Sequence, residues 1–310
     1  MIDVHTHYVP RGMSTPSDGP WVRDDSVIML GQQEFRRIGP DSWDVEVRLS
    51  DMDADGVGVQ VVSPTPVFFC YDAPAKAAVH IARVANDAAL EMCAGAPDRL
   101  LPMCQVPLQD PDAACAELSR CVGAGHVGDR DLDDAGVVTF LQHAASLGAP
   151  VFVHPWDLPS SVRLDRWMAR WLTGMPAETH LSIVAMILGG VFDQVGPELR
   201  ICFAHGGGSF PFWLGRLENA WHRRPELVGV SQHPPSAYLG RFSVDSVVFD
   251  ERALRLLVDT LGVEQVMVGS DYPYPLGERP VGRVVREASF LDDAARQQIM
   301  VGNARKYLGL

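Results

Sequence analysis

The stretch that decides the fold lies at the start of the chain and reads Ile2-Asp3-Val4-His5-Thr6-His7. Its apolar residues predict a short β-strand that ends on two histidines. Side chains two residues apart on a strand point to the same face, so both histidines can face the interior of a barrel. A His-x-His pair also occurs by chance in many sequences, so its meaning depends on what the rest of the chain places beside it.

Six further apolar runs predict strands, and helical patterns separate them along the chain. The predicted strands are residues 57–64, 100–108, 150–154, 200–205, 242–248 and 265–271, and the predicted helices include 73–94, 112–122, 135–147, 178–195, 251–261 and 292–301. Strands such as Val59-Gln60-Val61-Val62 are apolar on both faces, as in a parallel sheet covered on both sides. This order predicts an α/β fold, a (β/α)8 TIM-type barrel that forms one domain over residues 1–310. Residues 10–20, rich in Pro and Gly, predict a small excursion after strand 1, over the mouth of the barrel.

One strand of this barrel is missing from the pattern. The predicted helix 112–122 continues through Gly123-Ala124-Gly125-His126-Val127-Gly128 directly into the next helical pattern, where a fourth strand should lie. Either this strand is very short, or residues have been lost from the sequence. We favour the loss of residues, because a barrel that omits a strand has an open edge.

The composition is typical of a globular enzyme. Of 310 residues, 47% are hydrophobic and 21% are charged, and the formal net charge is −13. An acidic chain is a poor non-specific ligand for nucleic acids and anionic membranes, whereas a few buried arginines can still hold an acidic small molecule. The first residues show no signal-peptide pattern and the longest apolar runs are too short to span a bilayer, so we expect a cytoplasmic protein.

Polar side chains stand at the carboxyl ends of several predicted strands, the rim where barrel enzymes carry their active sites. They are His5, His7, His154, His205 and Asp271. Three imidazoles and one carboxylate, from His5, His7, His154 and Asp271, suit zinc or another first-row divalent ion. Each residue alone has a plainer explanation, since a histidine at a strand end is often an ordinary polar residue and Asp271 lies in a Gly-Ser-Asp-Tyr-Pro turn. Their joint occurrence favours a metal site.

His205 and two arginines are candidates for further roles at this site. His205 precedes three glycines, which either form a tight turn only or let the backbone approach a ligand. It is placed to act as a general acid and base beside the metal. Arginine clamps a carboxylate with two parallel hydrogen bonds, so Arg48 and Arg216 are candidates for substrate binding. Taken alone, either arginine could equally be a surface or salt-bridged residue.

Longer blocks of the sequence carry a more specific resemblance. They are Ile2–Pro10, Asp51–Val67, Gln105–Cys115, Val151–Asp157, Gly174–Ile183, Cys202–Arg216 and Gly269–Glu278, with HPWD, MPAET and HGGGSFPF the most distinctive motifs. In these blocks the chain resembles the amidohydrolase-related decarboxylase family. The resemblance implies one zinc ion held by His5, His7, His154 and Asp271, with His205 and Asp271 catalytic. It also implies that Arg48 and Arg216 bind two substrate carboxylates, and that Arg216 comes from the partner subunit of a homodimer.

The resemblance also bears on the number of metal ions and on the reaction. Two-metal barrel hydrolases often bridge their ions with a carboxylated lysine, and neither Lys76 nor Lys306 lies at a predicted strand end, so we expect one ion. The expected reaction is non-oxidative decarboxylation of an unsaturated amino-dicarboxylate semialdehyde. Alternatives are decarboxylation of an aromatic hydroxy-acid, hydrolysis or hydration of a lactone or unsaturated diacid, and a non-catalytic barrel. The chain departs from the family near residues 126–128, where a strand ending in an Ile-Gly-Asn-His-like segment is absent.

Overall fold

The computed structural model describes residues 1–11, 19–24, 26–121, 131–156 and 162–310 and contains the seven predicted parallel strands. These are β1 (Ile2–Tyr8), β5 (Val59–Pro64), β6 (Leu100–Pro102), β7 (Val151–Val153), β8 (Ile201–Phe203), β9 (Ser243–Asp245) and β10 (Val266–Met267). They form two sheets, in the orders β1-β5-β6 and β10-β9-β8-β7. Because every pairing within these two sheets is parallel, the carboxyl ends of the strands meet at one rim.

Backbone hydrogen bonds join the two sheets along β1. The Val4 amide donates to the Val268 carbonyl at 2.9 Å, and the His7 amide donates to the Tyr272 carbonyl at 2.7 Å. The strands therefore follow one another in the order β6-β5-β1-β10-β9-β8-β7. Within the described ranges the ring is open between β6 and β7. The predicted fourth strand near residues 126–128 lies outside the described residues.

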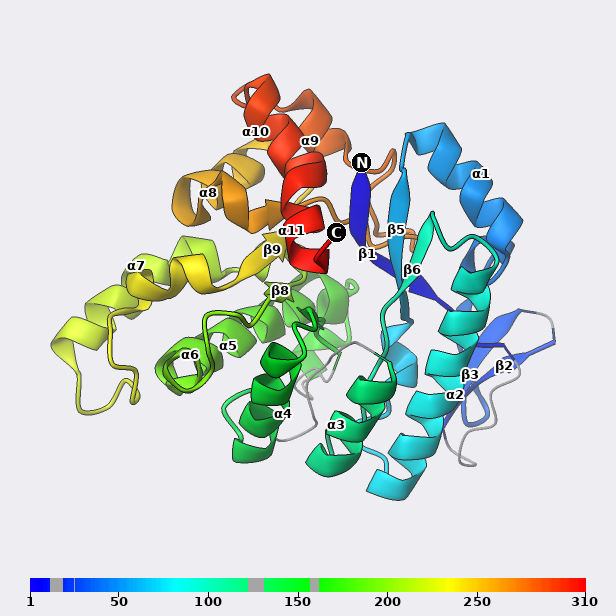
Figure 1. The fold of residues 1–310 in the computed structure, drawn as a ribbon, viewed down its shortest axis with the longest axis horizontal. Coiled ribbons are helices and arrows are strands. Elements are labelled where there is room, and N and C mark those ends of the chain that lie inside the picture. The colour runs from blue at the N-terminus through cyan, green and yellow to red at the C-terminus, as the bar shows by residue number, and fades with distance from the viewer. Residues whose placement is uncertain (12–18, 25, 122–130, 157–161) are drawn as a thin grey trace.

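Helices flank the strands on the outside (Figure 1). Their bounds are α1 (Val45–Asp55), α2 (Ala75–Ala94), α3 (Pro111–Arg120), α4 (Ala135–Ser146), α5 (Met175–Leu188), α6 (Val191–Gln194), α7 (Phe210–Arg223), α8 (Glu251–Leu261), α9 (Arg283–Glu287), α10 (Asp293–Gln297) and α11 (Asn303–Leu308). Aspartates cap five of them by accepting a backbone N–H in the first turn, at Asp44, Asp110, Asp134, Asp250 and Asp292. None of the described helices is long and apolar enough to cross a membrane.

Two predicted helices are interrupted in the structure. The predicted helix 178–195 consists of α5 and α6, which are separated at Gly190, where φ is +68°. A left-handed backbone angle of this kind ends a helix and favours glycine. The predicted helix 292–301 is α10 followed by a π-helical turn over residues 298–302. Helices α1 and α7 lie outside the helical ranges given above, and they carry the candidate site residues Arg48 and Arg216.

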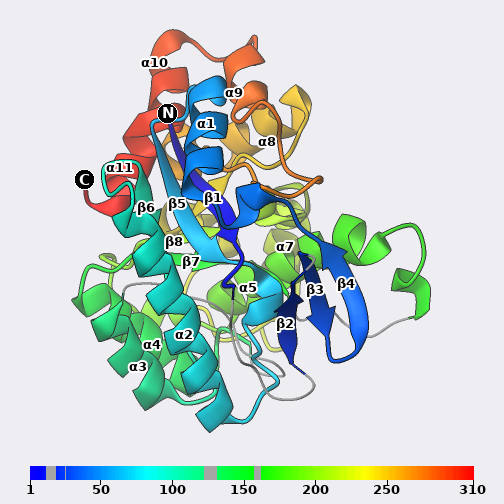
Figure 2. The ribbon, with the colours of Figure 1, turned by 90° about the vertical axis from the view of Figure 1, so that its right-hand side faces the viewer.

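The excursion after β1 is larger than predicted. Of the predicted residues 10–20, positions 12–18 lie outside the described residues, and beyond them the chain forms an antiparallel sheet of β2 (Pro20–Arg23), β3 (Val27–Leu30) and β4 (Gln33–Arg37). Figure 2 shows this sheet standing beside the parallel strands, near the carboxyl end of β1. It therefore adds residues up to Arg37 to one side of the rim.

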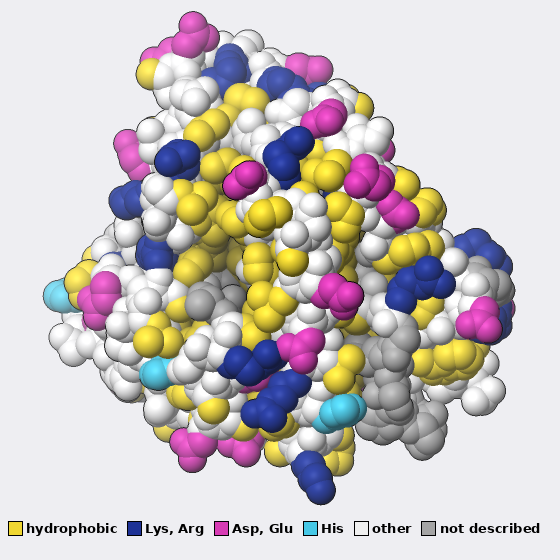
Figure 3. Space-filling model, turned by 45° about the vertical axis from the view of Figure 1, so that its right-hand side comes forward, with side chains coloured by type: hydrophobic (Ala, Val, Ile, Leu, Met, Phe, Trp, Pro, Cys, Tyr) yellow, Lys and Arg dark blue, Asp and Glu magenta, His cyan; other side chains and the backbone are white. Residues whose placement is uncertain are grey.

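Charged side chains of both signs are interspersed on the face of the molecule that Figure 3 shows. The apolar side chains pack mainly between the strands and the helices, where Phe203 and Val244 are fully buried. This arrangement matches a globular chain whose net charge of −13 comes from dispersed acidic residues.

The turn that follows β8 is fixed by glycine. His205, Gly206, Gly207 and Gly208 all have positive φ, at 55°, 61°, 72° and 61°. A Cβ atom on Gly208 would lie 2.0 Å from the carbonyl oxygen of Pro176, at the start of α5. A side chain cannot be accommodated there without moving backbone, so the turn that carries His205 is held against α5.

We expect Gly208→Ala to destabilise the protein for two reasons. The new side chain clashes with Pro176, and an alanine held at the positive φ of this position costs about 1–3 kcal/mol of backbone strain. Gly215→Ala is the matched control, since Gly215 lies within α7 and a Cβ there would meet nothing within 4 Å. Gly215→Ala should leave the free energy of unfolding unchanged or raise it by up to about 1 kcal/mol. Urea unfolding measures both, and equal midpoints for the two variants would contradict the role assigned to this turn.

Candidate active site

The structure brings the four predicted metal ligands together at the rim. His5 and His7 lie on β1, His154 follows β7 and Asp271 follows β10, and one potential ligand atom from each lies within 4.8 Å of the others. His7 Nε2 lies 3.1 Å from Asp271 Oδ1 and 3.2 Å from His5 Nε2. Three nitrogens and one carboxylate oxygen that converge in this way form the donor set that zinc prefers.

The surroundings of His7, His154 and Asp271 favour the protonation states that a metal requires. Burial lowers the pKa of His7 to about 4, and burial together with the neighbouring imidazoles lowers the pKa of His154. Burial alone would raise the pKa of Asp271, but its hydrogen bond to His7 and the nearby imidazoles hold that pKa at about 2. Neutral imidazoles and an ionised carboxylate are the metal-binding forms of these groups, so the residues fit a divalent ion at neutral pH.

The carboxylate of Asp245 orients His5 by contacting Nδ1, the ring nitrogen on the side away from the other ligands. Asp245 ends β9, and its Oδ2 lies 2.6 Å from His5 Nδ1. Its Oδ1 accepts the backbone N–H groups of Gly206 at 2.9 Å and Val247 at 3.1 Å. Burial lowers the pKa of His5, but the hydrogen bond and charge of Asp245 outweigh it and hold the pKa above its ordinary value. With the proton on Nδ1, His5 presents the lone pair of Nε2 to the other ligands.

His205 lies beside the ligand group without belonging to it. Its ring centroid is 5.2 Å from that of His5 and 5.0 Å from that of His154. Its Nδ1 is buried and has no hydrogen-bond partner among the described residues. Burial lowers the pKa of His205, so the imidazole is neutral near pH 7 and able to accept a proton. The acid and base role of His205 stays a prediction.

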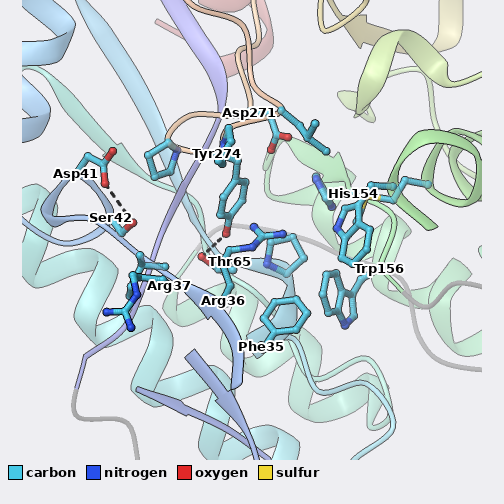
Figure 4. Close-up of a pocket in the computed structure, with 18 of the residues that line it drawn as sticks. Phe35, Arg36, Arg37, Asp41, Ser42, Thr65, His154, Trp156, Asp271 and Tyr274 are labelled. Carbon is cyan, nitrogen blue, oxygen red and sulfur yellow. Dashed lines mark hydrogen bonds between the residues drawn. The ribbon is translucent and has the colours of Figure 1, made fainter. Parts of the chain in front are cut away.

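A cavity of about 430 Å³ opens next to His154 and Asp271, a size suited to a small molecule. Most of its lining is aromatic or apolar, including Phe35, Trp156, Met168, Trp171, Met175 and Tyr274. Figure 4 shows Arg36, from β4, pointing into this cavity below Tyr274, while Arg37 points away from His154. The Cζ atom of Arg36 lies 4.5 Å from the Tyr274 ring and 5.3 Å from the Phe35 ring. Among the described carboxylates none forms an ion pair with Arg36, so its charge faces the cavity.

The two arginines predicted to bind substrate lie elsewhere. Arg48, on α1, is fully buried beneath β1 and is not among the described residues that line the cavity. Arg216 is exposed on α7, with its Cζ atom 5.9 Å from the Trp213 ring. Among the described residues, the arginines that line the cavity are Arg36 and Arg37, and of these Arg36 points into it. Sequence reasoning missed it because it considered only the ends of the parallel strands.

Comparisons with known proteins agree with this site. Residues 2–310 match the family model described as Amidohydrolase. The chain is 36% identical to 2-amino-3-carboxymuconate-6-semialdehyde decarboxylase of Dictyostelium discoideum, over 100% of this chain and 91% of that protein. It superposes with a TM-score of 0.83 on 5-carboxyvanillate decarboxylase from Sphingomonas paucimobilis, at 25% identity and covering 100% and 98% of the two chains. The corresponding Novosphingobium aromaticivorans structure, at 23% identity, TM-score 0.81 and coverage of 100% and 96%, is a complex with manganese.

The chain belongs to the amidohydrolase family, which the match over almost its entire length shows. The relative and the two structures named above are decarboxylases, and the chain is itself a metal-dependent decarboxylase. The superposition over the whole chain also supports the predicted TIM-type barrel, although the described strands leave the ring open between β6 and β7.

Substituting Asp245 should weaken metal binding without removing a ligand. We expect Asp245→Asn to lower metal affinity about 10- to 100-fold, because His5 loses the carboxylate that fixes its tautomer and orientation. Asp250→Asn is the control, since Asp250 is exposed and caps α8. Competition with a chelating dye measures both affinities, and an unchanged affinity in Asp245→Asn would show that His5 does not depend on this contact.

Proposed function

We propose that the protein decarboxylates 2-amino-3-carboxymuconate-6-semialdehyde to 2-aminomuconate-6-semialdehyde and carbon dioxide. The observation that carries this proposal is the position of Arg36, which forms no ion pair with a described carboxylate and lies in an aromatic cavity that also contains His154 and Asp271. A cation in the same cavity as the proposed metal ligands suits a substrate with two carboxylates. The decarboxylase from Dictyostelium discoideum, which the chain matches along its full length, is named for this substrate.

The donor set supports zinc as the metal, one ion per subunit. His5, His7, His154 and Asp271 would hold it, and other first-row divalent ions suit the same donors. When bound, such an ion lowers the pKa of a water molecule towards about 7 and so supplies a nucleophile at neutral pH.

The chain's own residues then position the substrate and move the proton. Neutral His205 takes a proton from the water that adds to the double bond beside the departing carboxylate, and returns it to the adjacent carbon. The bond between that carbon and the carboxylate then breaks, and carbon dioxide leaves. Its electron pair restores the double bond as the added hydroxyl departs. Asp271, which stays ionised, offsets the positive charge that His205 gains.

Arg36 holds one substrate carboxylate in this proposal. The Tyr274 ring supports its guanidinium from one side, and the Tyr274 hydroxyl is itself fixed by donating to Thr65 Oγ1 at 2.7 Å. Phe35 and Trp156 meet edge to face, with ring centroids 6.0 Å apart, and form an apolar wall for the conjugated part of the substrate. The aromatic wall also suits the alternative substrate class, an aromatic hydroxy-acid, which has one carboxylate rather than two.

We propose further that the active unit is a homodimer in which Arg216 reaches the partner's cavity. Support comes from the apolar surface around Arg216 on α7, where Phe212 is 71% exposed and Trp213 is 42% exposed. Large exposed aromatic side chains that lie next to one another mark an association surface. Figure 1 shows α7 projecting from one side of the molecule, so it is available to a second copy.

The central test is product formation. The zinc-loaded protein, given freshly generated 2-amino-3-carboxymuconate-6-semialdehyde, should release carbon dioxide while the substrate absorbance falls. His205→Asn should lower kcat about 10²- to 10⁴-fold, because it removes the acid and base. His80→Asn, on the exposed face of α2, is the control and should keep wild-type activity. Release of carbon dioxide from aromatic hydroxy-acids alone would shift the assignment to the alternative.

Arg36 should determine the preference for a dicarboxylate. Loss of a charge-assisted hydrogen bond costs about 1.5–3 kcal/mol, so Arg36→Met should lower kcat/KM about 10- to 100-fold, chiefly through KM. Arg36→Lys should recover part of the loss. Arg23→Met removes an arginine from the same antiparallel sheet, where it pairs with Glu34 at 2.6 Å, and should leave KM unchanged. An unchanged KM in Arg36→Met would refute the assigned role.

Mixing two inactive variants tests the shared site. Arg216→Ala and His205→Asn should each be inactive, and a mixture that exchanges subunits should recover about a quarter of wild-type activity. Half of the dimers are then mixed, and each mixed dimer contains one intact site. Light scattering should report a dimer for both variants. No recovery from mixed dimers would place Arg216 outside the partner's cavity.

A further inference from the structure

Arg48 heads the largest side chains that are fully buried in the described structure. Its guanidinium lies under the end of β1, where Nη1 donates to Thr6 Oγ1 at 3.3 Å and to Gln60 Oε1 at 3.0 Å. Nη2 donates to the carbonyl oxygens of His7 and Asp41. A buried cation that uses both terminal nitrogens on the protein itself has little capacity left for a substrate carboxylate.

The contacts of Arg48 continue to a buried carboxylate on the same strand. Gln60 Nε2 donates to Asp3 Oδ2 at 3.5 Å, so Gln60 connects the guanidinium to the carboxyl group of Asp3. Asp3 Oδ1 accepts the backbone N–H of His5 at 3.2 Å. Asp3 Oδ2 also accepts the Ser270 hydroxyl at 2.6 Å. Arg48, Gln60 and Asp3 therefore form one hydrogen-bonded chain, which links α1, β5, β1 and the segment that follows β10.

The hydrogen-bonded chain of Arg48, Gln60 and Asp3 contacts three of the four metal ligands, either at their backbone groups or at the residues next to them. It contacts the His5 amide through Asp3 and the His7 carbonyl through Arg48. On the Asp271 side it holds Ser270, which precedes the ligand, and it packs under Tyr272, which follows it. The Cζ atom of Arg48 lies 4.6 Å from the Tyr272 ring. Groups that orient metal ligands in this way alter metal affinity although they never touch the ion.

We infer that Arg48 is a positioning residue of the metal site, which fixes His5, His7 and Asp271 relative to one another through Gln60, Asp3 and Tyr272. This assignment differs from the sequence-based prediction that Arg48 binds a substrate carboxylate. The inference rests on the metal site of the proposed function but not on the identity of the substrate. The two roles of Arg48 therefore predict different measurements.

The test compares Arg48→Met with Arg48→Lys, with Arg241→Met as the matched control. Arg241 is half-buried, donates to the carbonyls of Phe192, Val195 and Gly196 and stacks on Phe192, yet it lies two residues before β9, away from Asp245 at the strand's far end. Zinc affinity is measured by chelator competition, and ligand geometry by the visible absorption of the cobalt-substituted protein. Urea unfolding reports how far each variant is destabilised.

We expect Arg48→Met to bind zinc about 10- to 100-fold more weakly and to change the cobalt spectrum, with Arg48→Lys between it and the wild type. Arg241→Met should lose stability but keep the wild-type affinity and spectrum. Wild-type affinity and spectrum in Arg48→Met, with a raised KM for the dicarboxylate, would overturn the inference in favour of the carboxylate clamp. If Arg48→Met does not fold, Arg48→Lys and Gln60→Leu decide in the same way. A wild-type chain that binds no metal would overturn the proposed function as well.

Discussion

The hydrogen bond between His5 Nδ1 and Asp245 Oδ2, at 2.6 Å, ties the first strand of the chain to the strand that precedes the last. The same carboxylate accepts the amide of Gly206, so it also holds the glycine turn that carries His205. One side chain thus fixes both a ligand and the proposed acid and base. Because both oxygens of Asp245 are used by the protein, the geometry is set before any ion or substrate arrives, and little reorganisation remains for the reaction.

The two arginines near the site, Arg48 and Arg36, differ in burial and therefore in the roles that we assign to them. Removing a guanidinium from water is costly unless several acceptors surround it, and Arg48 has four of them. Arg36 is only partly buried, rests on the Tyr274 and Phe35 rings and pairs with no described carboxylate. An arginine that already has its partners stabilises structure, whereas one supported by aromatic faces still has donors to offer. The cavity therefore takes its positive charge from the excursion after β1 and not from the barrel strands.

Periodicity explains what could be predicted from the sequence. Short apolar runs bounded by glycine and proline located all seven parallel strands, and the two-residue spacing placed His5 and His7 on one face. Asp245 could not be singled out by the same argument, because it lies inside the predicted strand 242–248, whereas β9 ends at Asp245 in the structure. Arg48 could not be placed, since the α1 sequence is polar and resembles a surface helix, while contacts from distant segments bury it. Arg36 could not be placed either, because the antiparallel sheet that carries it meets the rim only in three dimensions.

The overall charge and the local charge of the protein act in opposite directions on an anionic substrate. A formal net charge of −13 disfavours its approach at long range, but this field is screened within about 8 Å at physiological ionic strength. Inside the cavity the Arg36 guanidinium lies among mostly apolar walls, in the same space as His154 and Asp271. In such surroundings a single cation acts more strongly than many distant acidic side chains. In the proposed mechanism, selectivity for a carboxylate therefore depends on where Arg36 is held, and Arg36 is held over the ring of Tyr274, three residues after the proposed ligand Asp271.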